Sequence, residues 1–146
     1  MPQMQVKMSQ GATPTPAHPQ TTWGADDVLA KLIAVLPKAT TDEQHSALEA
    51  LQAGRYSQCK IYPCLALDDP FVKAIGYMSS IPTVISKGVP TLPTLIGESC
   101  RAIADACYGQ ALLDNQSEDN ALTIKRDATA TLHQINQDIF AKGLGK

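Results

Sequence analysis

Two long segments with the periodicity of an α-helix, residues 92–114 and 118–141, constrain the fold of this chain most strongly. Apolar side chains recur in both at the three- and four-residue spacing that lines one face of a helix. The first segment carries Leu92, Leu95, Ile96, Cys100, Ile103, Cys107 and Leu113, and the second carries Leu122, Ile124, Ala128, Leu132, Ile135 and Ile139. Because only a short polar turn separates them, the two helices should be antiparallel neighbours. The sequence therefore predicts a small, mainly α-helical domain with a long antiparallel helix pair as its spine.

Two shorter helices are expected before this pair, over residues 25–36 and 41–53. The first ends at a proline, which cannot continue a helix. Thr40 and Glu43 have the spacing of a capping box at the start of the second helix. Gly54 is suited to close that helix, since glycine readily adopts the left-handed conformation that commonly follows a helix.

The stretch between the second helix and the long pair, residues 57–91, is interrupted by prolines. Asp69-Pro70 has the form of a helix cap followed by proline in the first turn, which predicts a short helix over about 70–78. Thr83 to Ile85 is a β-branched run and predicts a short strand. A long connection inside a compact domain is usually functional. We therefore expect a long projecting loop or short hairpin that contacts something else.

The first 22 residues differ in composition from the rest of the chain. Their prolines are Pro2, Pro14, Pro16 and Pro19, and they alternate with Gln, Thr and Ala. Proline lacks a backbone donor and fixes φ, so this stretch is expected to be an extended arm that is disordered on its own. The chain thus divides into an arm, residues 1–22, and a helical domain, residues 23–146, which contains residues 57–91 as an inserted loop.

The charge balance narrows the possible functions. The chain has 12 Lys and Arg against 14 Asp and Glu, a formal net charge of −2, which argues against a protein that coats nucleic acid through a basic surface. No apolar run approaches the roughly 20 residues that a membrane span needs, and the N-terminus has no apolar secretion-signal region. We therefore expect no membrane partner and reduced cysteine thiols.

Catalytic and metal-binding patterns are weak in this sequence. Its cysteines and histidines are Cys59, Cys64, Cys100, Cys107, His18, His45 and His133. The cysteine pairs lack the C-x2-C spacing of common zinc sites, and no glycine-rich phosphate loop or nucleophile motif occurs. We expect no enzyme activity, no catalytic residue, no cofactor and no metal site. A thiol- or metal-dependent enzyme that uses Cys59, Cys64 and His45 is the weaker alternative.

A set of short landmarks runs through the helical domain. Residues 51–56 read Leu-Gln-Ala-Gly-Arg-Tyr at the end of a helix, Pro93 begins a Pro-x-Leu pair that opens a long helix, and Ile103 to Tyr108 continue it. The last helix carries Arg126-Asp127-Ala128 and ends at a Lys-Gly pair. Over roughly residues 25–143, this pattern resembles the tailed-bacteriophage head–tail connector (adaptor) proteins, including the Mu-like prophage branch. The residues to which the resemblance gives structural roles are Gly54, Arg55, Tyr56, Pro93, Tyr108 and Arg126.

The resemblance implies a virion structural protein. Connector subunits of this family form a ring beneath the portal, match its twelve-fold symmetry and lengthen the channel for genomic DNA, which passes without sequence-specific binding. The ring also offers a platform for a stopper or tail-completion protein. The resemblance thus implies a chain made in the host cytoplasm and located in the virion neck, between capsid and tail. It implies no catalysis and no cofactor.

Contacts between subunits and with the portal are expected in the arm, residues 1–22, and in the insertion, residues 57–91. Such segments can become ordered only against a partner, so the entropy cost falls at assembly. The expected apolar anchors in or beside them are Met4, Met8, Trp23, Phe71, Tyr77, Met78 and Ile81. Two alternative functions remain, namely another neck or tail-completion component and a soluble helical module that binds other proteins.

Overall fold

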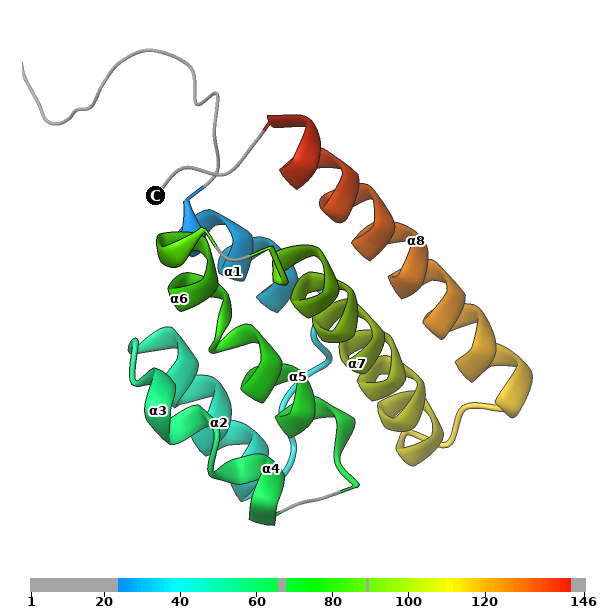
Figure 1. Ribbon diagram of the computed structural model, residues 1–146. Helices are drawn as coiled ribbons and strands as arrows, with labels where there is room; N and C mark the ends of the chain where they lie inside the picture. The colour runs from blue at the N-terminus through cyan, green and yellow to red at the C-terminus, as the bar shows by residue number, and fades with distance from the viewer. Residues whose placement is uncertain (1–23, 66–67, 89, 143–146) are drawn as a thin grey trace, which may run out of the picture.

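The computed structural model describes residues 24–65, 68–88 and 90–142. Over these ranges the chain is mainly α-helical and contains no β-strand (Figure 1). The helices are α1 (Ala25–Ile33), α2 (Asp42–Gln52), α3 (Tyr56–Cys59), α4 (Tyr62–Leu65), α5 (Pro70–Met78), α6 (Ile81–Lys87), α7 (Leu92–Leu113) and α8 (Glu118–Lys142). The predicted fold class is therefore confirmed. The expected arm, with Met4 and Met8, and the neighbouring Trp23 lie outside the described residues.

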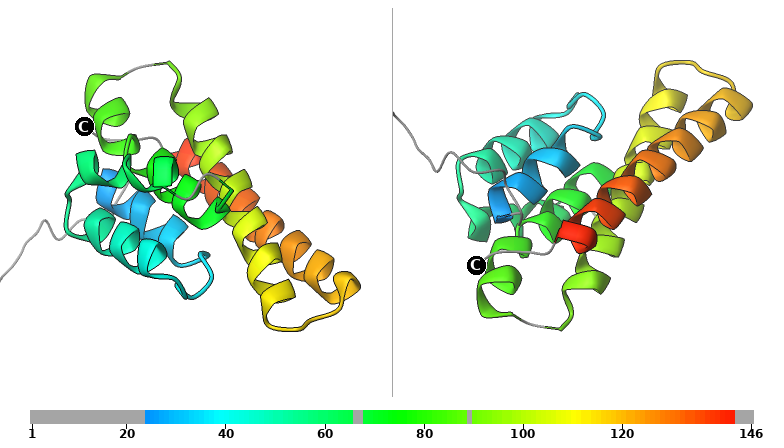
Figure 2. Two further views of the ribbon diagram at one scale, coloured as in Figure 1. Left: turned by 90° about the horizontal axis from the view of Figure 1, so that it is seen from below. Right: turned by 90° about the horizontal axis from the view of Figure 1, so that it is seen from above.

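The two longest helices, α7 and α8, form the predicted antiparallel pair. Both views in Figure 2 show the turn end of this pair extending beyond the other helices. On its other side α7 packs against α5, so α7 lies between α5 and α8 (Figure 1). Pro93 lies in the first turn of α7, as predicted, although Thr91 makes no capping hydrogen bond with any residue that the structure describes. The helix pair thus forms the spine of the fold.

The side of α8 that faces the core is rotated from the predicted apolar stripe. The buried side chains of α8 are Ala121, Ala128, Leu132 and Ile139. Leu122 and Ile124, predicted to be buried, are instead 45% and 38% exposed. Ala121 lies seven residues before Ala128, so these two share a face. The small alanine side chain there lets the two helices approach closely, and the larger Leu122 is turned to the surface.

Helix α2 has the predicted ends, but its capping box lies one residue later than expected. The hydroxyl of Thr41 accepts a hydrogen bond from the backbone N–H of Gln44 at 3.1 Å. The Gln44 side-chain oxygen accepts in return from the backbone N–H groups of Thr40 and Thr41, at 2.8 and 3.4 Å. At the other end, Gly54 adopts φ +78° and allows the N–H of Arg55 to reach the carbonyl of Ala50 at 2.8 Å. This is the hydrogen bond of a Schellman motif, which confirms the predicted role of Gly54.

Residues 57–91 are not the projecting loop or hairpin that the sequence predicted. They fold mainly into short helices, and Thr83 to Ile85 lies within α6 rather than in a strand. The predicted helix over 70–78 is confirmed as α5, whose start is capped by a hydrogen bond of 2.8 Å from the Phe71 N–H to the Asp69 carboxylate. Proline in the first turn also starts α6, and Gly88 ends it with φ +66°. Local start and stop signals thus outweigh the strand preference of the β-branched run.

The core of the molecule is built around α5. This helix contacts both α2 and α7, and its apolar residues lie on most of its circumference, as is typical of a buried helix. Phe71, Met78 and Ile81, expected as exposed anchors for partners, are at most 1% exposed and belong to this core. That expectation is corrected, because a side chain already enclosed by its own chain has no surface left for a partner. Tyr77 alone of these four reaches the surface, with 38% exposed.

Candidate interaction surface

A concave feature of the described residues lies along the helix pair. A groove of about 570 Å³ runs between α7 and α8. Its lining residues are Gly97, Cys100, Arg101, Ala104 and Asp105 from α7, and Lys125, Thr129, Leu132, His133 and Asn136 from α8. The groove is shallow on the α7 side, because Gly97 has no side chain and Ala104 has only a methyl group. A methyl group added at Gly97 would meet no atom of the described residues within 4 Å.

Polar contacts cross the groove near the turn end of the pair. The Lys125 ammonium lies 3.1 Å from a carboxylate oxygen of Asp105 and 5.7 Å from the centre of the Tyr108 ring. The Tyr108 hydroxyl lies 3.4 Å from the Glu118 carboxylate. Exposed ion pairs of this kind contribute less than about 1 kcal/mol each. Their effect here is to fix the orientation of Lys125 and to neutralise its charge within the same chain.

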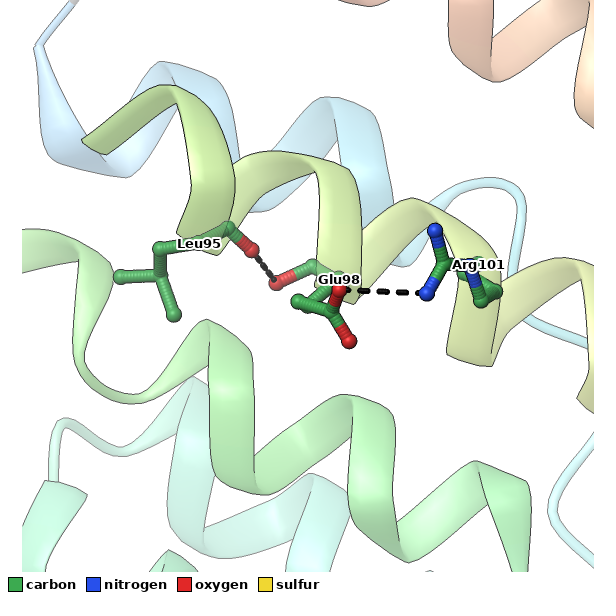
Figure 3. Close-up of polar contacts among 4 residues, drawn as sticks. Leu95, Glu98 and Arg101 are labelled. Carbon is green, nitrogen blue, oxygen red and sulfur yellow. Dashed lines mark hydrogen bonds and ion pairs between the residues drawn. The ribbon is translucent and has the colours of Figure 1, made fainter. Parts of the chain in front are cut away.

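The opposite end of the α7 wall carries a second ion pair. Figure 3 shows Glu98 and Arg101 side by side on α7, with 3.2 Å between guanidinium nitrogen and carboxylate oxygen. The same view includes the hydrogen bond of 2.9 Å that the buried hydroxyl of Ser99 donates to the Leu95 carbonyl. The Ser99 hydroxyl is thereby satisfied within its own helix, whereas the Arg101 guanidinium remains largely in solvent beside the groove.

Large apolar side chains are exposed at both ends of the groove. Leu122 and Phe140 of α8 are each 45% exposed, and Leu112 of α7 is similarly exposed. Leu112 follows Asp105 and Tyr108 by seven and four residues, so it continues the α7 wall of the groove. We call the groove together with Leu112, Leu122 and Phe140 the open face. Exposed apolar side chains beside a groove are one feature of surfaces that bind other molecules.

Those proposed anchors that the structure describes do not form this surface. Phe71, Met78 and Ile81 lie in the core, and Tyr77 lies on α5. Sequence reasoning assigned Leu122 to the buried stripe and overlooked Leu112 and Phe140. The sequence does contain a pattern that points to this surface. It is a second stripe on α8, in which alternating steps of four and three residues connect Leu122 with Phe140.

The residues that carry the family resemblance have structural roles at several places. Gly54 closes α2, and the Arg55 guanidinium donates to the Gln58 side chain at 3.1 Å in the turn that follows. Tyr56 packs against the core. Burial is the main cause that raises the pKa of its hydroxyl, and the negative charge of the nearby Asp26 adds to it. Pro93 starts α7, and Tyr108 connects the two long helices as described above. Arg126 is exposed on α8.

The cysteine side chains and the possible metal ligands of the described residues were the basis of the weaker, enzymatic alternative. The described residues contain no group of three or more His, Cys, Asp or Glu side chains that could hold a metal ion. All four cysteines are free thiols, of which Cys64 is exposed. Burial raises the pKa of the Cys100 thiol to about 11 and also raises the pKa of Cys59 and Cys107. None of the described helices is both long enough and apolar enough to span a membrane.

The thiols should therefore react unequally with a disulfide reagent. The thiolate is the reactive form, so a raised pKa and burial both slow the reaction. At about pH 8 we expect one fast-reacting thiol, that of the exposed Cys64, in the native protein and all four thiols to react after denaturation. Cys64→Ser should remove the fast phase, and Cys100→Ser should leave it unchanged. Two or more fast thiols in the native protein would contradict the slow reaction expected of Cys59, Cys100 and Cys107.

No protein family, curated protein or solved structure matches this chain.

Proposed function

We propose that this protein is a subunit of the head–tail connector (adaptor) ring of a tailed bacteriophage. In this role it joins the portal at the capsid vertex to the neck or tail and extends the channel for DNA. The observation that carries the proposal is the position of the motif residues. The Gly54-Arg55-Tyr56 turn closes α2, Pro93 opens α7, and Tyr108 and Arg126 belong to the long helix pair. The resemblance to the connector family implies an early helix closed by this turn and a long antiparallel helix pair after it. The agreement of these helices with that expectation supports the proposal.

The proposed activity is assembly rather than chemistry. Identical subunits that meet head to tail close into a ring when the rotation between them permits. In the insertion, residues 57–91, Ile61 and Tyr77 remain exposed and available for such contacts. The projecting end of the α7–α8 pair (Figure 2) suits contact with a neighbouring ring component. A net charge of −2 suits a channel wall, since a strongly basic surface would retain DNA.

The test is the mass of the purified full chain by light scattering, with and without the cognate portal protein. With the portal present, the proposal expects a ring-sized particle in which this chain adds to the portal in a fixed ratio. Ile61→Glu should weaken binding to the portal by at least about tenfold, as is typical when an apolar interface residue is replaced by a charge. A chain that never joins the portal, under conditions in which the portal itself assembles, would contradict the proposal.

A second candidate function is a helical module that binds other proteins. The observation that favours it is the open face, whose groove and exposed apolar side chains are typical of helix-in-groove recognition. Such a module would bind a helical peptide without assembling on a portal. The portal experiment therefore separates the two candidates, because only the connector adds to the portal in a fixed ratio.

A further inference from the structure

A second stripe of side chains follows the surface of α8. Its members are Leu122, Arg126, Thr129, His133, Asn136 and Phe140. They are separated by alternating steps of four and three residues, which keep them on one side of a helix and match the spacing of a coiled-coil seam. Thr129, His133 and Asn136 line the groove, so the stripe belongs to the open face. We call these six residues the outer stripe.

The outer stripe has the same pattern when it is read in either direction. Leu122 and Phe140 are the apolar ends, each 45% exposed, and the four residues between them are polar. An antiparallel pairing of α8 with α8 of a second copy, centred midway between Thr129 and His133, places Leu122 opposite Phe140 at both ends. A surface that is complementary to itself in this way fits a two-fold contact, in which the same patch is used by both subunits.

The charges of the open face permit this pairing. In the same register Arg126 lies opposite Asn136 of the second copy, and Thr129 lies opposite His133. The stripe therefore places no like charges directly opposite each other. Lys125, beside the stripe, is already paired with Asp105 of its own chain at 3.1 Å, so it brings no unpaired charge into the contact. Desolvating an unpaired charge would oppose association, and the register therefore places Arg126 opposite the side-chain oxygen of Asn136, an acceptor that has no hydrogen-bond partner among the described residues.

The groove offers space for the second helix. Its α7 wall contains Gly97 and Ala104. The wall is open at Gly97, because a methyl group built there would lie more than 4 Å from any atom of the other described elements. Side chains that flank the outer stripe of a second α8 would enter this space. The two helix pairs would then form a four-helix arrangement, the common way in which antiparallel helix pairs cover their apolar faces.

We propose that the protein forms a two-fold dimer through the open face, with α8 of one copy antiparallel to α8 of the other and Leu122 against Phe140 at both ends. This contact is separate from the ring contacts proposed above. A two-fold contact closes at two copies, whereas a ring needs head-to-tail contacts on other surfaces.

The first experiment measures the mass of the full chain by analytical ultracentrifugation, without any portal protein. At high micromolar concentration the wild type should have twice the mass of the 15.6 kDa chain. Leu122→Glu and Phe140→Lys should each raise the dissociation constant by at least about tenfold. Ile61→Glu is the matched control, since Ile61 is an apolar residue outside the helix pair that is at least as exposed as Leu122 and Phe140. It should leave the dimer intact.

Mixing the two variants tests the register itself. A heterodimer of Leu122→Glu with Phe140→Lys has the wild-type pair at one end and an opposite-charge pair at the other. The mixture should therefore associate at least about tenfold more tightly than either variant alone. A parallel pairing would place both charged residues against unchanged apolar partners, so mixing would relieve like-charge repulsion but form no opposite-charge pair and restore no wild-type pair. Because both sites are half exposed, circular dichroism should show unchanged helix content, and Leu122→Ser and Phe140→Ser provide milder replacements.

The outcomes are distinct from those of the portal experiment. A wild-type chain that stays monomeric at high micromolar concentration overturns the dimer proposal, as does a dimer that both variants leave unchanged. Dissociation by each variant without recovery on mixing overturns the antiparallel register. Ile61→Glu should weaken portal binding while preserving the dimer, so either proposal can fail while the other stands.

Discussion

Phe71→Ala is expected to lower the free energy of unfolding by about 3–5 kcal/mol. The Phe71 side chain is 1% exposed and lies on α5, which contacts both α2 and α7. Its removal would leave a cavity at the point where these three helices meet. The surrounding helices can close such a cavity only in part, so the loss includes both the apolar burial and the missing contacts.

Urea unfolding followed by circular dichroism would measure this loss. Tyr77→Ala is the matched control, because it removes an aromatic ring from the same helix at a position that is 38% exposed. The control should lose less than half as much stability as Phe71→Ala. A loss below about 1 kcal/mol for Phe71→Ala, within the range of ordinary substitutions, would contradict its place in the core. So small a loss would instead agree with the sequence-based prediction that Phe71 is an exposed anchor for partners.

Ile103→Ala should cost about 2–5 kcal/mol of stability. Ile103 is fully buried in α7, the helix that lies between α5 and α8. Removing its outer carbon atoms weakens the packing of the spine of the fold. Ile103→Val removes a single methyl group and should cost only about 0.5–1.5 kcal/mol. The two variants together form a series in which the loss should increase with the volume removed.

The control for this series is Leu113→Ala, at the end of the same helix. Leu113 is 72% exposed, so its truncation should change stability by no more than about 0.5 kcal/mol. All three variants would be unfolded with urea. A shifted midpoint with the same slope as the wild type indicates a loss of stability, whereas a changed slope indicates a change in cooperativity. Equal losses for Ile103→Ala and Leu113→Ala would contradict the burial of Ile103.

The parts of the fold that the sequence predicted correctly depend on neighbours along the chain. Helical periodicity located α7 and α8, because residues three and four apart share one face of a helix regardless of what covers it. Asp69-Pro70 located the start of α5, and Gly54 the end of α2, because a cap and a left-handed glycine act within one turn.

The errors arose where two local signals competed. The run from Thr83 to Ile85 favours a strand, yet it follows a Pro82 that starts a helix and precedes a Gly88 that ends one. Ile81 and Ile85, one turn apart, are both buried, which a helix permits. Thr40 and Thr41 could each cap α2, and the backbone N–H of Gln44 donates to the hydroxyl of Thr41. The Gln44 side chain also donates to the Asp69 carboxylate at 3.0 Å. That last contact joins residues 25 positions apart and could not be predicted from local spacing.

The sequence contains two stripes on α8, and for a related reason it could not decide which of them reaches the surface. Phe71 and Phe140 are both apolar, and nothing in their local pattern distinguishes a core residue from a surface one. Other helices enclose Phe71, whereas Phe140 lies near the end of α8 and remains 45% exposed. The choice depends on which elements pack on each side, and that is a property of the whole fold.

The sequence by itself determined that this chain is helical, where its long helices begin and end, and that they form an antiparallel pair. These features follow from hydrogen bonds and side-chain spacing within a few residues. Only the tertiary structure decided which way each helix is turned. Ala121 rather than Leu122 meets the neighbouring helix, because close packing favours the smaller side chain where two backbones approach. That rotation places Leu122 and the rest of the outer stripe on the surface, where they are available to a partner.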